Sequence, residues 1–272
     1  MKTPASGLMK RKMISGRFKG VCNVNYRNTV EFEVYGDYAL FTDPVMHLGG
    51  EKCTLQIPTY EALKGVLSSV YWKPTLIWVI DAVRVVNPIQ TEVKGVRPIK
   101  YAGGNDLSFY TYLKNCRYQV RAHFIWNENR PELAVDQNEN KHHNIARRMI
   151  SRGGRRDVFL GTRECQAYVE PCVFGEGPGA YDSTPELAFG LMYHGMTYAD
   201  EAYSPETQGH MTTRYWHPVM RKGVIEFLPP EDCPIQRVVR EMEVKPFGEE
   251  HRNFTGLREF SDAECTQEEG AT

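Results

Sequence analysis

The chain has 272 residues, 41% of them hydrophobic, which is enough for one domain with a sizeable core or for a full domain with a smaller one. The apolar run from Leu76 to Ile80 ends at Asp81, and no apolar run approaches the roughly 20 residues that a membrane-spanning helix needs. The seven cysteines are an odd number without a CxxC pair or a preceding apolar signal segment. They indicate reduced thiols in a cytoplasmic protein, rather than a disulfide framework or a zinc site.

The formal net charge of −1 hides an uneven distribution of charge along the chain. Residues 1–28 contain seven basic side chains and no acid, whereas the tail from Ser261 contains four acids and no base. We expect residues 1–28 to be a disordered basic extension and residues 247–272 to be a disordered acidic tail.

The first predicted elements are a strand and a helix. Apolar and polar residues alternate from Thr29 to Tyr38, which predicts a strand with one buried face and a bend or bulge at Gly36-Asp37. A helix should then begin after Thr59, its N-cap, and Pro74 should end it. Its apolar residues recur at helical spacing, at Leu63, Val66, Leu67 and Val70.

Two further strands, a second helix and a fourth strand should follow. The β-branched and aromatic residues of Ile77–Val86 and Tyr118–Trp126 predict strands. A short helix is expected from about His142 to Ile150, where Gly153-Gly154 would stop it. Residues Arg156 to Val169 are expected to supply the last strand.

This order of elements predicts an α+β, ferredoxin-like domain with an antiparallel sheet over residues 29–170, a pattern shared by RNA-recognition modules. The order alone decides little about function, since the fold carries many unrelated activities. The chain from Pro171 is rich in Gly, Pro and Tyr, which predicts a smaller β-rich C-terminal domain over residues 171–246.

The segment from Lys141 to Arg156 is the most informative one for function, because it is strongly basic and contains no acid. Its cations and its glycine pair could contact successive phosphates, although a solvated basic helix is the simpler explanation. The basic residues continue through a glycine loop into a strand, which favours nucleic-acid contact. The residues predicted to bind RNA here are Arg147, Arg148, Arg152, Gly153, Gly154, Arg155 and Arg156.

A second basic stretch, residues 94–117, interleaves cations with aromatic side chains. Cations hold phosphates and aromatic rings stack on unpaired bases, so Arg97 and Lys100 are predicted to contact RNA. A hairpin loop whose aromatic residues pack into the core explains the pattern nearly as well.

The pattern of acids and histidines does not favour metal chemistry. His142 and His143 are adjacent rather than four apart, and nearby acids such as Asp136 are expected to be solvated, so no metal or cofactor is predicted. Cleavage of RNA by its own 2′-hydroxyl instead needs proton transfer and a cation on the phosphorane. Lys141-His142 supplies both, although a histidine at a helix start is more often a capping or surface residue.

Several segments closely resemble a known family. They are FEVYGDYALFTDP, IPTYEALKGVLSSVYWKPT, NPIQTEVKGVRPI, Lys141-His142, GGRRDVFLGTRECQAYV and EDCPIQRVVREMEVKPF. Together they resemble the subtype I-C CRISPR-associated Cas family five, in its repeat-processing d variant, from about Val30 to Pro246. The family's catalytic Tyr, Lys and His would then correspond to Tyr71, Lys141 and His142.

The resemblance implies a metal-independent endoribonuclease that cleaves CRISPR precursor RNA at the 3′ base of the repeat hairpin. The products would carry 2′,3′-cyclic phosphate and 5′-hydroxyl ends. The protein would then stay on the 5′ handle of the guide RNA, beside the backbone and large subunits of the type I-C interference complex. Two alternatives stay open from the residues: a non-catalytic subunit that caps the guide RNA, and a metal-dependent DNA nuclease.

Overall fold

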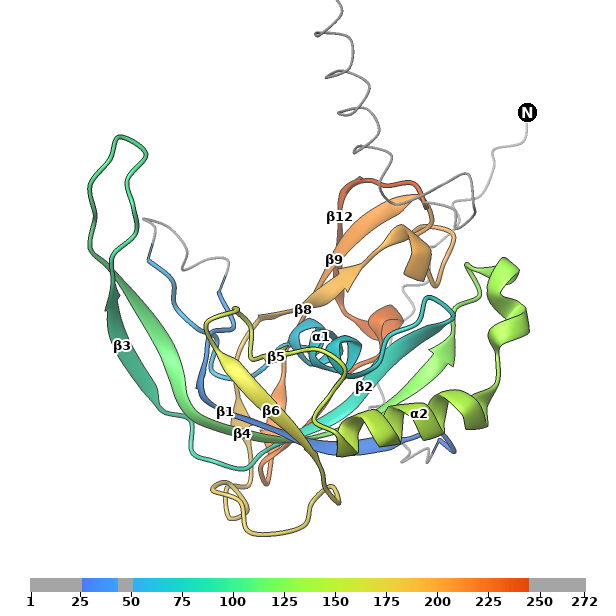
Figure 1. Cartoon of the computed structure of the whole chain (residues 1–272), viewed down its shortest axis with the longest axis horizontal. Coiled ribbons are helices and arrows are strands. Elements are labelled where there is room, and N and C mark those ends of the chain that lie inside the picture. The colour runs from blue at the N-terminus through green and yellow to red at the C-terminus, as the bar shows by residue number, and fades with distance from the viewer. Residues whose placement is uncertain (1–25, 44–50, 245–272) are drawn as a thin grey trace, which may run out of the picture.

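The computed structural model describes residues 26–43 and 51–244, in which two α-helices lie against a mostly antiparallel β-sheet (Figure 1). The helices are α1, Tyr60–Val70, and α2, Glu139–Ser151; the 3-10 helices are η1, Pro131–Asp136, η2, Ala199–Glu201, and η3, Pro230–Asp232. The first six strands are β1, Val30–Ala39, β2, Leu76–Val85, β3, Thr91–Val96, β4, Ser108–Trp126, β5, Val158–Phe159, and β6, Gln166–Pro171. The other six are β7, Leu187–Ala188, β8, Met192–Thr197, β9, His210–Trp216, β10, Val219–Arg221, β11, Val224–Glu226, and β12, Ile235–Glu241.

The main sheet has the strand order β5-β6-β1-β4-β2-β11-β10-β7, and β3 pairs with the first half of β4. β1 pairs antiparallel with both β4 and β6, and β4 pairs antiparallel with β2. Strands far apart in sequence therefore lie side by side, and α1 and α2 cover the same face of the sheet (Figure 1). The core between these layers includes Phe32, Val34, Leu67, Trp78 and Val120.

Both predicted helices are present, and capping interactions explain where they begin and end. The side chain of Thr59 caps α1 by accepting a hydrogen bond from the Ala62 amide at 3.1 Å. α2 begins at Glu139, earlier than expected, because Asn138 caps it and accepts from the Lys141 amide at 3.0 Å. Gly154, in a left-handed conformation, ends α2 by donating its amide hydrogen to the Met149 carbonyl at 2.8 Å.

Two expected strands differ from the observed ones. The strand predicted over Tyr118–Trp126 is only the second half of β4. The strand begins at Ser108 because β3 pairs with residues 108–113 and β1 continues its pairing to Leu113. The strand predicted over Arg156–Val169 is split into β5 and β6 by a turn that contains Gly161, whose φ is +93°. A Cβ at this glycine would lie 2.0 Å from the Leu40 carbonyl oxygen, so the turn packs directly on backbone.

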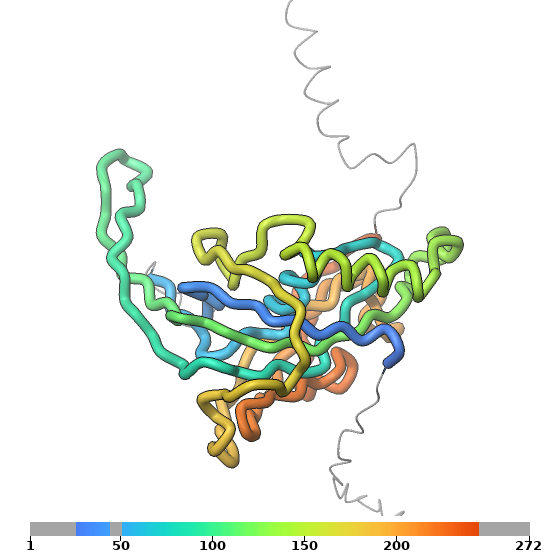
Figure 2. Tube along the Cα trace, turned by 60° about the horizontal axis from the view of Figure 1, so that its bottom comes forward, coloured from blue at the N-terminus to red at the C-terminus, as the bar shows by residue number. Residues whose placement is uncertain are grey.

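The β3–β4 hairpin forms an arm that extends beyond the rest of the sheet (Figures 1 and 2). Its tip includes Ile99 and Tyr101, both fully or almost fully exposed. Tyr112, nearer the base of the arm, is buried in the core, whereas Phe109 is half exposed. The explanation in which the aromatic residues of this stretch pack into the core therefore holds for Tyr112 and is wrong for Tyr101.

The chain after residue 171 contributes to two sheets. β8, β9 and β12 form a separate three-stranded sheet, whereas β7, β10 and β11 extend the main sheet beyond β2. The three-stranded sheet is joined to α1, since the Met196 amide donates to Glu61 Oε2 at 3.1 Å. The domain boundary at residue 171 stays a prediction, and residues 1–25 and 245–272 lie outside the described residues.

Within the described part of the chain, no helix combines the length and apolar character that a membrane span requires.

Candidate active site

The structure brings Tyr71, Lys141 and His142 together where the end of α1 meets the start of α2. Tyr71 follows the last residue of α1, and its amide still donates to the Leu67 carbonyl at 2.8 Å. Its extended backbone directs the hydroxyl to His142 Nδ1, 2.7 Å away. Residues 71 positions apart in sequence thus share one hydrogen bond.

Both ring nitrogens of His142 have a partner. Nε2 lies 2.7 Å from the main-chain oxygen of Asp136, which can only accept a hydrogen bond. In the neutral ring, Nε2 therefore carries the hydrogen, and Nδ1 accepts a hydrogen bond from Tyr71. His142 is 0% exposed and packs against Phe124 and Trp126, so its ring does not reach the surface.

Lys141 differs from its neighbour because its side chain is 49% exposed. Its ammonium group forms an ion pair with the Asp136 carboxylate. Asp136 Oδ2 also accepts a hydrogen bond from the Thr75 hydroxyl at 3.2 Å. Asp136 was expected to be solvated; its side chain is 30% exposed, and η1 turns it toward the start of α2, where it has these two partners.

Burial raises the pKa of Tyr71 above its ordinary value of 10.0. The negative charge of Asp136 raises the pKa further, and the positive charge of Arg155 acts in the opposite direction. Tyr71 is therefore a phenol, not a phenolate, at neutral pH. It can donate one hydrogen and accept another, but it cannot act as a free base.

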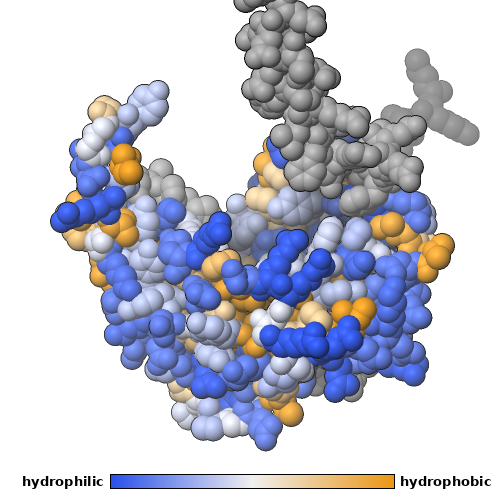
Figure 3. Space-filling view, viewed as in Figure 1, coloured by the Kyte–Doolittle hydropathy of each residue, from blue (hydrophilic) through white to orange (hydrophobic). Residues whose placement is uncertain are grey.

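The predicted RNA-binding residues of α2 and its glycine loop lie on the surface. Arg147, Arg148, Arg152, Arg155 and Arg156 are all exposed, and none forms an ion pair with another described residue. Hydrophilic side chains gather over α2 in Figure 3. Gly153 and Gly154 both have positive φ, and the Arg156 amide donates to the Ser69 carbonyl at 3.1 Å. This bond places the loop beside the end of α1, next to Tyr71.

The predicted RNA-binding residues of the arm are not part of this cluster. Arg97 and Lys100 lie between β3 and β4, and Lys100 forms an ion pair with Asp106 at 3.5 Å. The structure therefore presents two separate basic surfaces, one on α2 and one on the arm.

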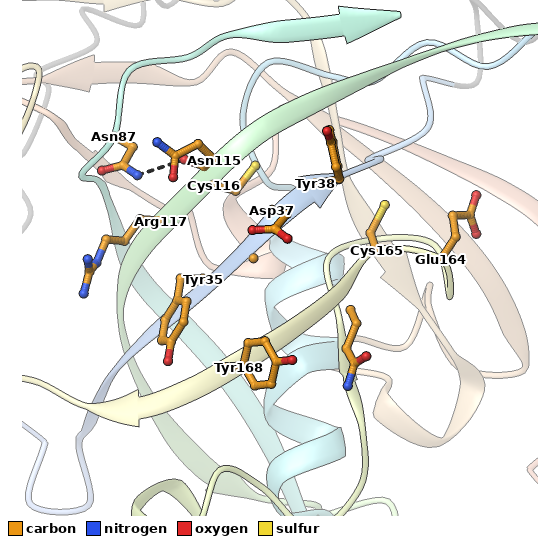
Figure 4. Close-up of a pocket in the computed structure, with 12 residues that line it drawn as sticks. Tyr35, Asp37, Tyr38, Asn87, Asn115, Cys116, Arg117, Glu164, Cys165 and Tyr168 are labelled. Atoms are coloured by element: carbon orange, nitrogen blue, oxygen red, sulfur yellow. Dashed lines mark hydrogen bonds between the residues drawn. The ribbon is translucent and has the colours of Figure 1, made fainter. Parts of the chain in front are cut away.

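A pocket of about 300 Å³ lies between β1, β4 and β6 (Figure 4). Tyr35, Tyr168 and Arg117 line it together with Asp37 and Glu164. None of the predicted site residues lines this pocket. At the candidate active site Lys141 is half exposed, whereas Tyr71, 4% exposed, and His142 are buried.

Among residues 26–43 and 51–244, no group of three or more His, Cys, Asp or Glu side chains is arranged to hold a metal ion. Metal independence of the activity stays a prediction.

Comparison with known proteins places the chain among CRISPR-associated proteins. The model of a family described as CRISPR-associated protein (Cas_Cas5), in its Cas5d form, matches residues 29–228. The chain therefore belongs to the Cas5d family, as the resemblance predicted.

Three relatives illustrate the likeness. The CRISPR pre-crRNA endoribonuclease Cas5d of Thermus thermophilus is 26% identical over 216 residues, which are 72% of this chain and 90% of the relative. The protein of the same name from Mannheimia succiniciproducens is 28% identical over 165 residues, 52% of this chain and 71% of the relative. A solved crystal structure of a CRISPR-associated protein is 33% identical and has a TM-score of 0.65, covering 77% of this chain and 96% of that one.

Proposed function

We propose that this protein is an endoribonuclease that cleaves CRISPR precursor RNA at the 3′ base of the repeat hairpin without a metal ion. The observation that carries the proposal is a cluster beside a surface of unpaired arginines, in which Tyr71 bonds His142 and Asp136 bonds both His142 and Lys141. Two family relatives that are named pre-crRNA endoribonucleases support it. The β6-β1-β4-β2 order, with two helices on one face, supports a ferredoxin-like fold for the domain.

The buried position of His142 suggests how the first proton moves. The RNA 2′-hydroxyl donates its proton to the Tyr71 oxygen while the Tyr71 hydrogen passes to His142 Nδ1, 2.7 Å away. Tyr71 stays neutral, which fits its raised pKa. His142 becomes an imidazolium ion, with Nε2 3.5 Å from Asp136 Oδ2. In this relay His142 acts on the RNA through Tyr71.

Lys141 and the exposed arginines act on the phosphate. As the 2′-oxygen attacks, charge builds on the phosphorane, and the half-exposed Lys141 ammonium stabilises it. The bond to the 5′-oxygen breaks, and this oxygen takes a proton from the solvent. The first products carry a 2′,3′-cyclic phosphate and a 5′-hydroxyl.

The direct test is incubation of the purified protein with repeat RNA in EDTA. We expect one cut at the 3′ base of the hairpin, at a rate that EDTA leaves unchanged, because the proposed groups are all side chains of this chain. Tight binding without cutting, with or without metal, would instead identify a non-catalytic subunit that caps the guide RNA. Cutting of DNA only after addition of a divalent metal would favour the DNA nuclease.

The basic surface of α2 should hold the RNA. Reversing the charge of Arg147 and Arg148 to Glu should weaken repeat binding and flatten its salt dependence, since each lost phosphate contact removes about 0.7–0.9 from the slope of log K against log salt. Arg237→Glu with Arg240→Glu is a matched control on β12, where both residues are exposed. Filter binding across a salt series measures the affinity of each variant and its salt dependence. Equal slopes for the α2 variant and the wild type would contradict this placement.

We also propose that the protein stays on the 5′ handle of its product, beside the backbone and large subunits of the type I-C interference complex. The exposed arm with Arg97 and Lys100 supports a second RNA contact, away from the cleavage site.

A further inference from the structure

Asp136 contacts both Lys141 and His142. It is the last residue of η1, and its carboxylate binds both the Lys141 ammonium and the Thr75 hydroxyl. Its main-chain oxygen accepts hydrogen bonds from His142 Nε2 at 2.7 Å and from the Asn138 amide at 2.9 Å. One residue thus determines where the lysine lies and which nitrogen of the histidine carries the hydrogen.

We propose that Asp136 is a positioning residue of the cleavage site, a role that rests on the function proposed above. Its carboxylate holds Lys141 at the place where the phosphorane forms. Its main-chain oxygen keeps the His142 ring in the tautomer that accepts a proton from Tyr71. Asp136 itself does not touch the RNA.

The anchoring of Asp136 supports this role. Thr75, which donates to the carboxylate, is buried directly before β2, and its carbonyl accepts from the Asn127 amide at 2.9 Å. One carboxylate oxygen of Asp136 is therefore held by Thr75, at the start of β2, while the other binds Lys141 of α2. A lysine with four rotatable bonds loses much of its freedom only when such a fixed partner holds it.

Charge distinguishes this role from a purely structural one. Lys141 keeps the Asp136 pKa below its ordinary value, so the group is a carboxylate at neutral pH. A carboxylate near the scissile phosphate repels the substrate, while an exposed ion pair contributes little to stability. Asp136 should therefore weaken ground-state binding and still favour the transition state, because the lysine it holds meets the phosphorane.

The test separates kcat from KM. Asp136→Asn keeps the size, a partner for Thr75 and the main-chain oxygen, and removes only the charge. We expect kcat on repeat RNA to fall by about 10-fold to 100-fold, the order expected for a misplaced catalytic group, with KM unchanged or lower. Glu139→Gln is the matched control, since Glu139 is an acid in the first turn of α2 without an ion pair among the described residues, and it should cleave at the wild-type rate.

A double variant tests whether Asp136 acts through Lys141. The double variant Lys141→Ala/Asp136→Asn should cleave no more slowly than Lys141→Ala alone. Without the lysine, the Asp136 carboxylate has no ammonium group to position. Asp136→Glu, which keeps the charge, should recover part of kcat and guards against a folding defect in the Asn variant.

Three results would overturn the inference: an unchanged or raised kcat for Asp136→Asn, multiplicative effects in the double variant, or no recovery with Glu. If the wild-type protein itself does not cut repeat RNA, the proposed function fails as well.

Discussion

A repeat RNA with a single 2′-deoxy sugar just upstream of the scissile phosphate should bind normally and stay intact. The nucleophile in the proposed reaction is that 2′-hydroxyl, and no other group on the RNA can form the cyclic product. The loss should therefore be complete within detection, whereas groups that only assist the reaction should leave a residual rate. Gel analysis of end-labelled RNA after incubation with excess protein measures the cut, and a competition assay measures binding.

A deoxy sugar one position further downstream is the matched control, and it should be cut like the all-ribose RNA. Cutting of the upstream deoxy substrate would identify water as the nucleophile. The assignment of Tyr71, Lys141 and His142 would then be wrong, and activation of that water by a metal ion would be the first alternative to examine.

His142→Ala should reduce cleavage by about 10² to 10⁴, the usual contribution of general acid–base catalysis, with little loss of hairpin binding. The ring is fully buried, so it does not contribute contacts to the RNA. Tyr71→Phe should produce a loss of similar size, because the relay needs the hydroxyl that lies 2.7 Å from Nδ1. The double variant should be no slower than the slower single variant, since the two side chains act as one unit. Single-turnover cleavage with excess protein measures these rates.

Two control variants distinguish a loss of catalysis from a folding defect. His143 is adjacent in sequence and bonds the Thr29 carbonyl at 3.0 Å, so His143→Ala should cleave within a few-fold of wild type. His142→Gln preserves an amide donor for the Asp136 oxygen and most of the buried volume, and it should still be slow because an amide cannot take up the proton of Tyr71. Full activity of His142→Gln at an unchanged melting temperature would remove His142 from the mechanism.

Local signals predicted the helices better than the strands. Thr59 and the glycine pair after α2 marked helix ends correctly, because caps act within a few residues of the chain. Strand ends depend on partners. β4 is longer than predicted because β3 pairs with its first half, and the last predicted strand is broken where Gly161 packs on Leu40. Neither partner is visible from the alternation of side chains alone.

The sequence by itself determined the residue types that carry the chemistry: a Lys-His pair, a run of arginines broken by glycines, and motifs that identify the family. It also predicted β1, α1, β2 and α2 in their order, because the periodicity of apolar residues follows the local backbone, but it did not predict β3. Tyr71 was found by resemblance alone, since nothing near it in sequence marks it as reactive.

Only the tertiary structure decided which role each of these residues can have. His142 and Lys141 are neighbours in sequence, yet one is enclosed by Phe124 and Trp126 while the other is half exposed. Asp136 looked like a solvated loop acid, but η1 turns it toward both of them. The physical reason is that burial, tautomer and ion pairing depend on which elements meet. Here the end of α1, the start of α2 and the residue before β2 come together only when the sheet brings them into contact.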